Sequence, residues 1–146
     1  MKIYTIGFAG KSAEEFFTLL TKNGIQRLVD IRLNNVSQMA AFTKKDDLRY
    51  FLRVIAGIDY VHLPILAPTK EILEDYRKGK DWEQFERRFV KLIEEVKPIE
   101  GIDTALFTEK VCCLLCSEPE AEHCHRRLVA EYLLKHSKEP VEVVHI

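Results

Sequence analysis

The chain has no apolar run long enough to cross a membrane, because its longest one, residues 111–116, has only the length of a β-strand. Its first residues read as a strand and lack the pattern of a signal peptide. An excess of one charge sign is also missing, since 22 Lys and Arg face 23 Asp and Glu, for a net charge of −1. A chain so balanced has no general attraction for nucleic acid or an anionic membrane. These absences predict a cytoplasmic protein without a membrane partner, and the charge does not indicate nucleic acid.

The positions of the four cysteines argue against a secreted disulfide framework. Three of them lie within residues 112–116, too close together to pair across a small domain. Cys112 and Cys113 belong to the apolar run and are interpreted as small buried residues. Cys113 and Cys116 have a spacing seen in metal sites, but residues three apart on a strand face opposite sides and cannot bind one ion.

Strand and helix patterns alternate along the chain, which has the length of one domain. Segments rich in strand-forming residues predict strands at residues 2–6, 25–31, 58–63, 110–116 and 141–145. Apolar residues at helical spacing predict helices between them. This order predicts a single α/β domain over residues 1–146, with a mostly parallel five-stranded sheet and helices on both faces.

Capping residues predict where the helices begin and end. They place helix starts at Ser12, Thr43, Asp81 and about His123, and a helix stop at Gly57. Residues 99–109 show no clear pattern.

Functional groups of a parallel sheet gather where its strands end. Several residues able to carry chemistry lie at or just beyond such ends: Gly7, Asp30, Arg32, His62, Cys116 and Glu118. Cys124, His125 and Arg126 open the helix after the fourth strand and should face the same edge. We therefore expect these residues to form one candidate site.

Cys124 is the predicted nucleophile of this site. The N-terminus of a helix stabilises an anion and can lower the pKa of a thiol placed there. His125 and Arg126 add hydrogen-bond donors and positive charge beside it. Glu120 and Glu122 oppose an anionic substrate at the same helix end.

Three other interpretations of this cluster stay open. The helix end could bind an anion without covalent chemistry. Cys116, Cys124 and the histidines could bind a metal ion, although their spacing matches no common zinc hook. In a purely structural interpretation, Glu118 caps the last helix and Arg126 pairs with Asp30.

The remaining candidates have supporting roles. Arg32, Arg126 and Glu118 would place the substrate, with Asp30 orienting it or simply pairing with Arg32. His62 or His125 would move protons near neutral pH. Gly7 indicates a close backbone approach or a tight turn. The chain carries no P-loop, dinucleotide fingerprint or nucleophile elbow.

Short motifs over nearly the whole chain form an ordered set, which comprises Thr5-Ile6-Gly7, Phe16-x-x-Leu19-Leu20, Leu28-Val29-Asp30-Ile31-Arg32, Ser37, Gly57-Ile58-x-Tyr60-x-His62-Leu63-Pro64, Cys116-x-Glu118 and Cys124-His125-Arg126. The set, and its Cys-His-Arg ending above all, resembles the small proteins grouped as domain-of-unknown-function family 488. The chain departs from that pattern at Asn34-Asn35, where a proline is common, and at Leu66-Ala67, where Leu-Gly is common. The resemblance supports the location of the site and implies no particular reaction.

The sequence thus favours an enzyme with a thiolate and arginine site for an anionic small molecule, such as a phosphate-bearing compound or a nucleotide. Whether it would be a cysteine-dependent transferase or hydrolase stays open. The alternatives are a non-catalytic module that binds a nucleotide, nucleic acid or protein, and a metal-binding protein. No cofactor is predicted, and the sequence does not indicate an oligomeric state.

Overall fold

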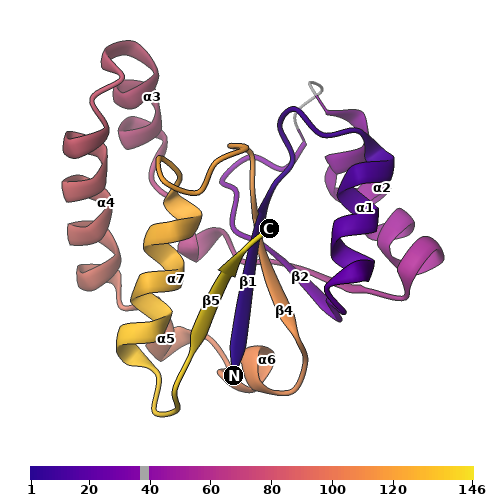
Figure 1. Cartoon of the computed structure of the whole chain (residues 1–146). Coiled ribbons are helices and arrows are strands. Elements are labelled where there is room, and N and C mark those ends of the chain that lie inside the picture. Colours follow the sequence, from indigo (N-terminus) through magenta and orange to yellow (C-terminus); the bar gives the residue numbers. More distant parts are fainter. Residues whose placement is uncertain (37–39) are drawn as a thin grey trace.

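A five-stranded sheet organises the computed structural model, which describes residues 1–36 and 40–146. Its strands are β1 (Lys2–Gly7), β2 (Arg27–Asp30), β3 (Asp59–His62), β4 (Cys112–Cys116) and β5 (Glu142–His145). They lie in the order β3-β2-β4-β1-β5, and every neighbouring pair is parallel (Figure 1). The predicted α/β fold is confirmed, and the sheet is parallel throughout.

Helices cover both faces of this sheet (Figure 1). One face carries α1 (Ala13–Lys22), α2 (Lys45–Phe51) and a π-helical turn, η2 (Leu52–Ala56). The other carries α4 (Trp82–Val96) and α7 (His125–His136), and α3 (Lys70–Gly79) packs against α4. Short turns complete the chain: η1 (Ala41–Thr43), η3 (Pro64–Leu66), α5 (Pro98–Gly101) and α6 (Ala105–Thr108).

The central strand β4 is buried along its whole length because helices cover it on both sides. Its side chains alternate between two apolar cores. Cys112 and Leu114 face the core under α4 and α7, whereas Cys113 and Leu115 face the core under α1. The prediction that Cys112 and Cys113 are buried is confirmed.

Most helix boundaries follow local capping chemistry. The Ser12 side chain accepts a bond from the Glu15 backbone N–H at 3.1 Å, as the capping box predicts. The Asp81 carboxylate caps α4 in the same way, through the Gln84 N–H. Gly57 ends η2 in the left-handed conformation, with φ 61°.

Two helices begin one or two residues later than predicted. The helix expected at Thr43 begins as α2 at Lys45, because the Thr43 hydroxyl donates to the Ala40 carbonyl inside the preceding turn η1. The last helix begins at His125, not His123, with Cys124 as its N-cap. Residues 99–109, where no pattern was clear, contain parts of the short helices α5 and α6. Ser37, one of the motif residues, lies outside the described residues.

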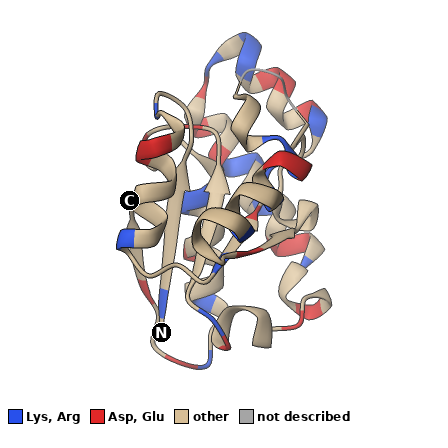
Figure 2. Ribbon diagram, turned by 90° about the vertical axis from the view of Figure 1, so that its right-hand side faces the viewer, with Lys and Arg blue, Asp and Glu red and all other residues tan. Residues whose placement is uncertain are grey.

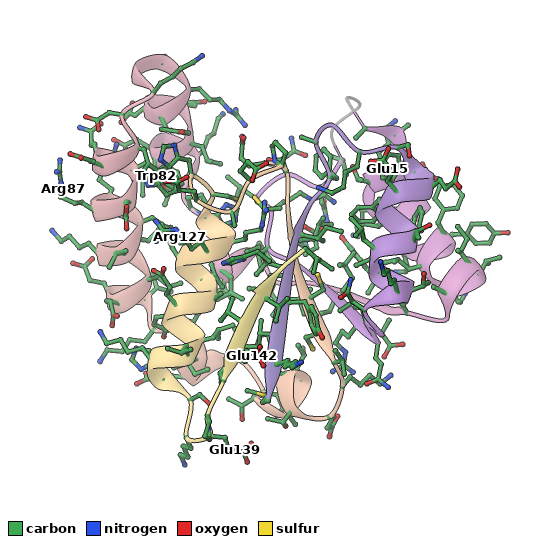
Figure 3. All side chains as sticks on the ribbon, viewed as in Figure 1. Glu15, Trp82, Arg87, Arg127, Glu139 and Glu142 are labelled. Carbon is green, nitrogen blue, oxygen red and sulfur yellow. The ribbon has the colours of Figure 1, made fainter. Side chains whose placement is uncertain are left out.

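The surface mixes charges of both signs, as Figure 2 shows for one side of the molecule. Trp82 and Arg127 lie close together between α4 and α7, with the guanidinium 6.0 Å from the centre of the Trp82 ring (Figure 3). Arg127 also pairs with Glu86 of α4 and with Glu131 of its own helix. Across the described ranges, no helix has both the length and the apolar character that a membrane crossing needs.

The packing of α1 generates the first prediction. Phe16 is fully buried, and its ring centre lies 5.2 Å from that of Phe17 and 5.5 Å from that of Phe42. We expect Phe16→Ala to lower the free energy of unfolding by about 3–5 kcal/mol, because it removes a large apolar side chain and leaves a cavity. Denaturant unfolding measures this. Val54→Ala, at a side chain 60% exposed, is the control and should change stability by less than about 0.5 kcal/mol. A loss below 1 kcal/mol for Phe16→Ala would contradict this packing.

Candidate functional site

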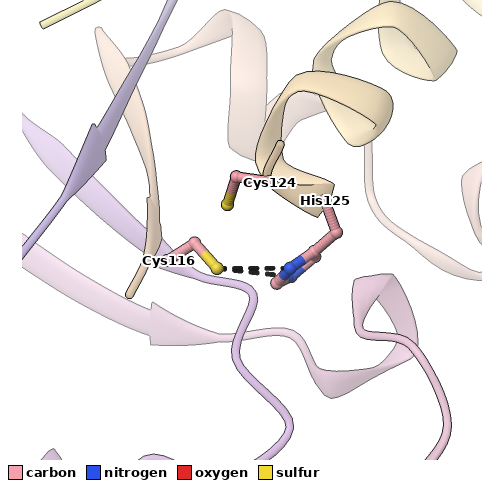
Figure 4. A group of neighbouring side chains, drawn as sticks. All are labelled: Cys116, Cys124 and His125. Carbon is pink, nitrogen blue, oxygen red and sulfur yellow. Dashed lines mark hydrogen bonds between the residues drawn. The ribbon is translucent and has the colours of Figure 1, made fainter. Parts of the chain in front are cut away.

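The candidate site lies at the carboxyl edge of the sheet, where β4 meets its two neighbours. The register pairs Cys116 with Gly7 of β1 and Leu115 with Asp30 of β2. Residues 117–124 then form a loop that returns the chain to the start of α7. This return brings Cys124 and His125 next to Cys116 (Figure 4).

Cys116 and His125 form a thiol–imidazole pair. The Cys116 Sγ lies 3.2 Å from His125 Nδ1. The other ring nitrogen, Nε2, lies 2.9 Å from the carbonyl oxygen of Ile31. Because a carbonyl can only accept, Nε2 carries a proton and donates it, which leaves Nδ1 of the neutral ring as the acceptor facing the thiol. The Phe89 ring meets the imidazole edge-on, with 5.7 Å between ring centres, and holds it in place.

Cys124 completes a compact buried cluster. Its sulfur, the Cys116 sulfur and a ring nitrogen of His125 all lie within 4.8 Å of one another. The three side chains are 4% (Cys116), 2% (Cys124) and 6% (His125) exposed. The cluster is thus almost completely shielded from solvent.

The pKa values of the two thiols in this cluster are shifted in opposite directions. Burial alone would raise the pKa of Cys116, but hydrogen bonds from the Cys124 thiol and from Ser117, with the charge of Arg126, outweigh it and lower that pKa. The pKa of Cys124 is raised, first by its hydrogen bond to Cys116 and then by burial. The expectation that a helix N-terminus lowers the pKa of Cys124 is therefore not met, because the neighbouring Cys116 and burial both raise it.

Arg126 fastens the loop that carries this cluster. It is one of the largest fully buried side chains in the described structure. Its Nε donates to the Thr5 hydroxyl at 3.2 Å, and its two terminal nitrogens donate to the carbonyl oxygens of Glu118 and Pro119. The structural alternative of an Arg126–Asp30 pair is wrong, since the guanidinium is bonded to β1 and to the loop. Glu118 contributes its backbone here, while its side chain is exposed.

Gly7 makes room for the same loop. A Cβ atom built on Gly7 would lie 1.6 Å from the carbonyl oxygen of Glu118 and 2.6 Å from an Arg126 nitrogen. The close backbone approach suggested by the sequence is therefore present, and the approaching backbone is the 117–124 loop. Lys11 adds a further bond at this point, from its Nζ to the Gly7 carbonyl at 2.7 Å.

A second polar cluster lies beside the first, at the ends of β2 and β3. The buried Asp30 carboxylate accepts bonds from Arg32 Nε and Nη2, each at 2.8 Å, and from the Tyr60 hydroxyl at 2.5 Å. Arg32 Nη2 also donates to the Thr43 carbonyl at 2.7 Å. His62 Nε2 donates to the Arg32 carbonyl, again at 2.7 Å. The Asp30–Arg32 pair predicted as the ordinary alternative is present. Asp30 also accepts a bond from the Arg32 backbone N–H, and Arg32 binds the Thr43 carbonyl, so the pair stabilises the chain that follows β2.

Sequence reasoning missed Tyr60 and Thr43 in this second cluster. Tyr60 and His62 are two residues apart on β3, so the sequence places them on the same face of the strand. The contact of Tyr60 with Asp30 also requires that β3 lie beside β2, which the sequence does not predict. Thr43 takes part only through its backbone carbonyl, for which the sequence has no signal.

The donor atoms of Cys116, Cys124 and His125 are also of the kinds that zinc and copper(I) accept. The bond from His125 Nε2 to a backbone carbonyl is the orientation that metal-binding histidines commonly have. Chemical type thus permits a metal ion, and the same geometry suits a reactive thiol. Three surface hollows lie away from the thiol cluster. Their volumes are about 350 Å³ beside Phe17 and Phe51, 500 Å³ beside Arg27 and Tyr60, and 580 Å³ along α4 beside Arg87.

Comparison with known proteins yields one family. The model described as "Domain of unknown function DUF488" matches residues 12–133, a span that includes both polar clusters and leaves out Gly7. No curated protein and no solved structure matches the chain.

The crossing of the loop over Gly7 generates the second prediction. We expect Gly7→Ala to lower the free energy of unfolding by about 3 kcal/mol, because the new methyl group must push the Glu118 backbone away. Gly79→Ala is the matched control, since its Cβ would meet open space at the end of α3. That variant should be neutral or more stable by up to about 1 kcal/mol. Equal stabilities of the two variants in denaturant unfolding would show that the loop does not press on β1.

Proposed function

The chain belongs to the DUF488 family, and from this premise we propose that it is a thiol-dependent enzyme in which Cys116 is the nucleophile and His125 takes its proton. The observation that carries the proposal is the 3.2 Å contact between Cys116 Sγ and His125 Nδ1. A nucleophile and a base within hydrogen-bond reach, with the base oriented by a third group, is the arrangement that such catalysis needs. The Ile31 carbonyl is that third group.

The proposed reaction begins with transfer of the thiol proton to Nδ1 of His125. The Cys116 thiolate then attacks an electrophilic atom of the substrate, and the imidazole returns the proton to the leaving group. Cys124, whose sulfur lies within 4.8 Å of the Cys116 sulfur, lowers the pKa of Cys116 and so favours the thiolate. In this scheme Cys124 supports the nucleophile, whereas the sequence favoured Cys124 for the nucleophilic role itself.

An anionic substrate remains the class we propose, with support from charge. Cys116 ends β4 and lies beside the first residues of α7, Cys124 and His125, at the positive end of that helix. Lys11 and Arg126 add positive charge around Gly7. Arg126 and Arg32 donate to protein groups in the structure, so in this proposal they act on an anion through their charge.

The rate of cysteine alkylation as a function of pH tests the proposed nucleophile. We expect a small alkylating reagent to modify Cys116 first, at a pH below the range in which an ordinary thiol ionises, because the reactive species is the thiolate. Cys112, whose pKa burial raises to about 11, and the fully buried Cys113 serve as internal references. Cleavage at glutamate in addition to trypsin is needed, because one tryptic peptide, residues 111–126, holds all four cysteines.

Histidine variants supply the control for this measurement. We expect His125→Gln to slow alkylation of Cys116 at pH 7 by at least about tenfold, because the proton acceptor is lost. His123→Gln, at an exposed ring stacked on Trp82, should leave the rate unchanged. Faster modification of Cys124 than of Cys116 would return the nucleophile to Cys124. Modification that begins only after a chelator is added would show a metal site in place of a free thiolate.

A further inference from the structure

The orientation of the Cys124 side chain is unusual for its position in the fold. As the N-cap of α7, it occupies the place where a side chain normally accepts a bond from the helix backbone. In the described part of the chain, Cys124 makes no such capping bond. Its sulfur lies instead beside the sulfur of Cys116, within 4.8 Å.

We infer that Cys116 and Cys124 form a redox-active pair that a small hydroperoxide converts to a disulfide. The inference rests on the proposed function, because Cys116 must be the reactive thiol. It adds a second role, in which Cys124 resolves the oxidised Cys116. The sulfurs lie within 4.8 Å of each other, and a change of rotamer about a Cα–Cβ bond would reduce their separation toward the length of an S–S bond, about 2.05 Å.

The reaction balances in two steps. In the first, the Cys116 thiolate attacks the terminal oxygen of the hydroperoxide. The O–O bond breaks, the leaving alkoxide or hydroxide takes the proton held by His125, and Cys116 becomes a sulfenic acid. In the second, the Cys124 sulfur attacks the sulfenic sulfur, an S–S bond forms, and water leaves with the Cys124 proton. The peroxide gains two electrons and the two thiols together lose two.

Burial indicates a small oxidant. Cys116 is 4% exposed and Cys124 only 2%, so another protein's disulfide cannot reach either sulfur without opening the loop. Hydrogen peroxide is far smaller, so it requires much less movement of the loop than a protein disulfide does. Return to the reduced pair requires two equivalents of a thiol reductant, which are oxidised to a disulfide as the protein disulfide is reduced.

The other two cysteines lie outside this pair. Cys113 faces the core under α1, on the opposite side of the sheet from Cys112 and Leu114. Cys116 follows the alternation of β4 and lies on the same side as α7 and His125. Cys112 lies on this side as well, but at the opposite end of β4 from Cys116. Oxidation should therefore be confined to the Cys116–Cys124 pair.

The test treats the reduced protein with hydrogen peroxide in the presence of a chelator and then maps the cysteines. We expect one peroxide to be consumed per chain and a Cys116–Cys124 crosslink to appear after cleavage with trypsin and a glutamate-specific protease. Glu118, Glu120 and Glu122 lie between the two cysteines, so the cut fragments stay joined only by the disulfide. Dithiothreitol should reverse the crosslink.

Variants distinguish the resolving role from the nucleophilic one. In Cys124→Ser, we expect Cys116 to stop at the sulfenic acid, trapped by dimedone in at least about tenfold higher yield than in the wild type. Cys113→Ala is the control and should form the crosslink as the wild type does. Cys124→Ala is a second variant without the resolving thiol and should give the same result. Thermal unfolding checks that each variant is folded.

The outcomes separate this inference from the proposed function. If wild-type Cys116 is alkylated at low pH and oxidised by peroxide but ends as sulfenic or sulfinic acid, the resolving role is wrong and the nucleophile stands. A crosslink through Cys112 or Cys113 would also overturn the pair. If Cys116 reacts with neither reagent, both proposals are wrong.

Discussion

A buried guanidinium holds the candidate site together. Arg126 reaches from the first turn of α7 to Thr5 on β1 and to the carbonyls of Glu118 and Pro119 in the loop between. A buried arginine is costly unless its donors are satisfied, and these three partners supply acceptors from two segments distant in sequence. The loop can lie across β1 because Gly7 has no side chain there. The positions of Cys124 and His125 over the end of β4 follow from this one fastening.

The end of β2 links the thiol cluster to the carboxylate cluster. Asp30 binds the Arg32 side chain, and the carbonyl of the residue between them, Ile31, binds His125. The direction of the imidazole therefore depends on the backbone that Asp30, Arg32 and Tyr60 hold in place. Asp30, Arg32 and Tyr60 can affect the thiol cluster without touching a substrate. They hold the backbone on either side of Ile31, whose carbonyl accepts a hydrogen bond from His125 Nε2 and so determines the tautomer of that ring.

The sequence was sufficient for the fold class and for the edge at which the candidate residues gather. Alternating patterns identified all five strands, and the rule for parallel sheets placed Cys116 and His125 at one edge. Strand order was not predictable, because the lengths of the connections do not fix neighbours. Thr43 misled as a helix start since its hydroxyl bonds to a preceding carbonyl. The sequence favoured Cys124, whereas the proposal for Cys116 rests on its contact with His125 and on the Ile31 carbonyl that orients the ring, which no residue pattern encodes.

The energetics of the buried thiolate connect reactivity to the folded loop. Removing an ionised group from water costs several kcal/mol unless hydrogen bonds replace its hydration. Cys124 and Ser117, at the two ends of the loop, lower the pKa of Cys116, and His125 Nδ1 lies 3.2 Å from its sulfur. If the loop opened, Cys116 would gain access to solvent and lose Cys124 and His125 together. In the proposed function, the reactivity of Cys116 therefore depends on the closed loop, and the contacts of Arg126 and Gly7 would support the chemistry without touching the reacting atoms.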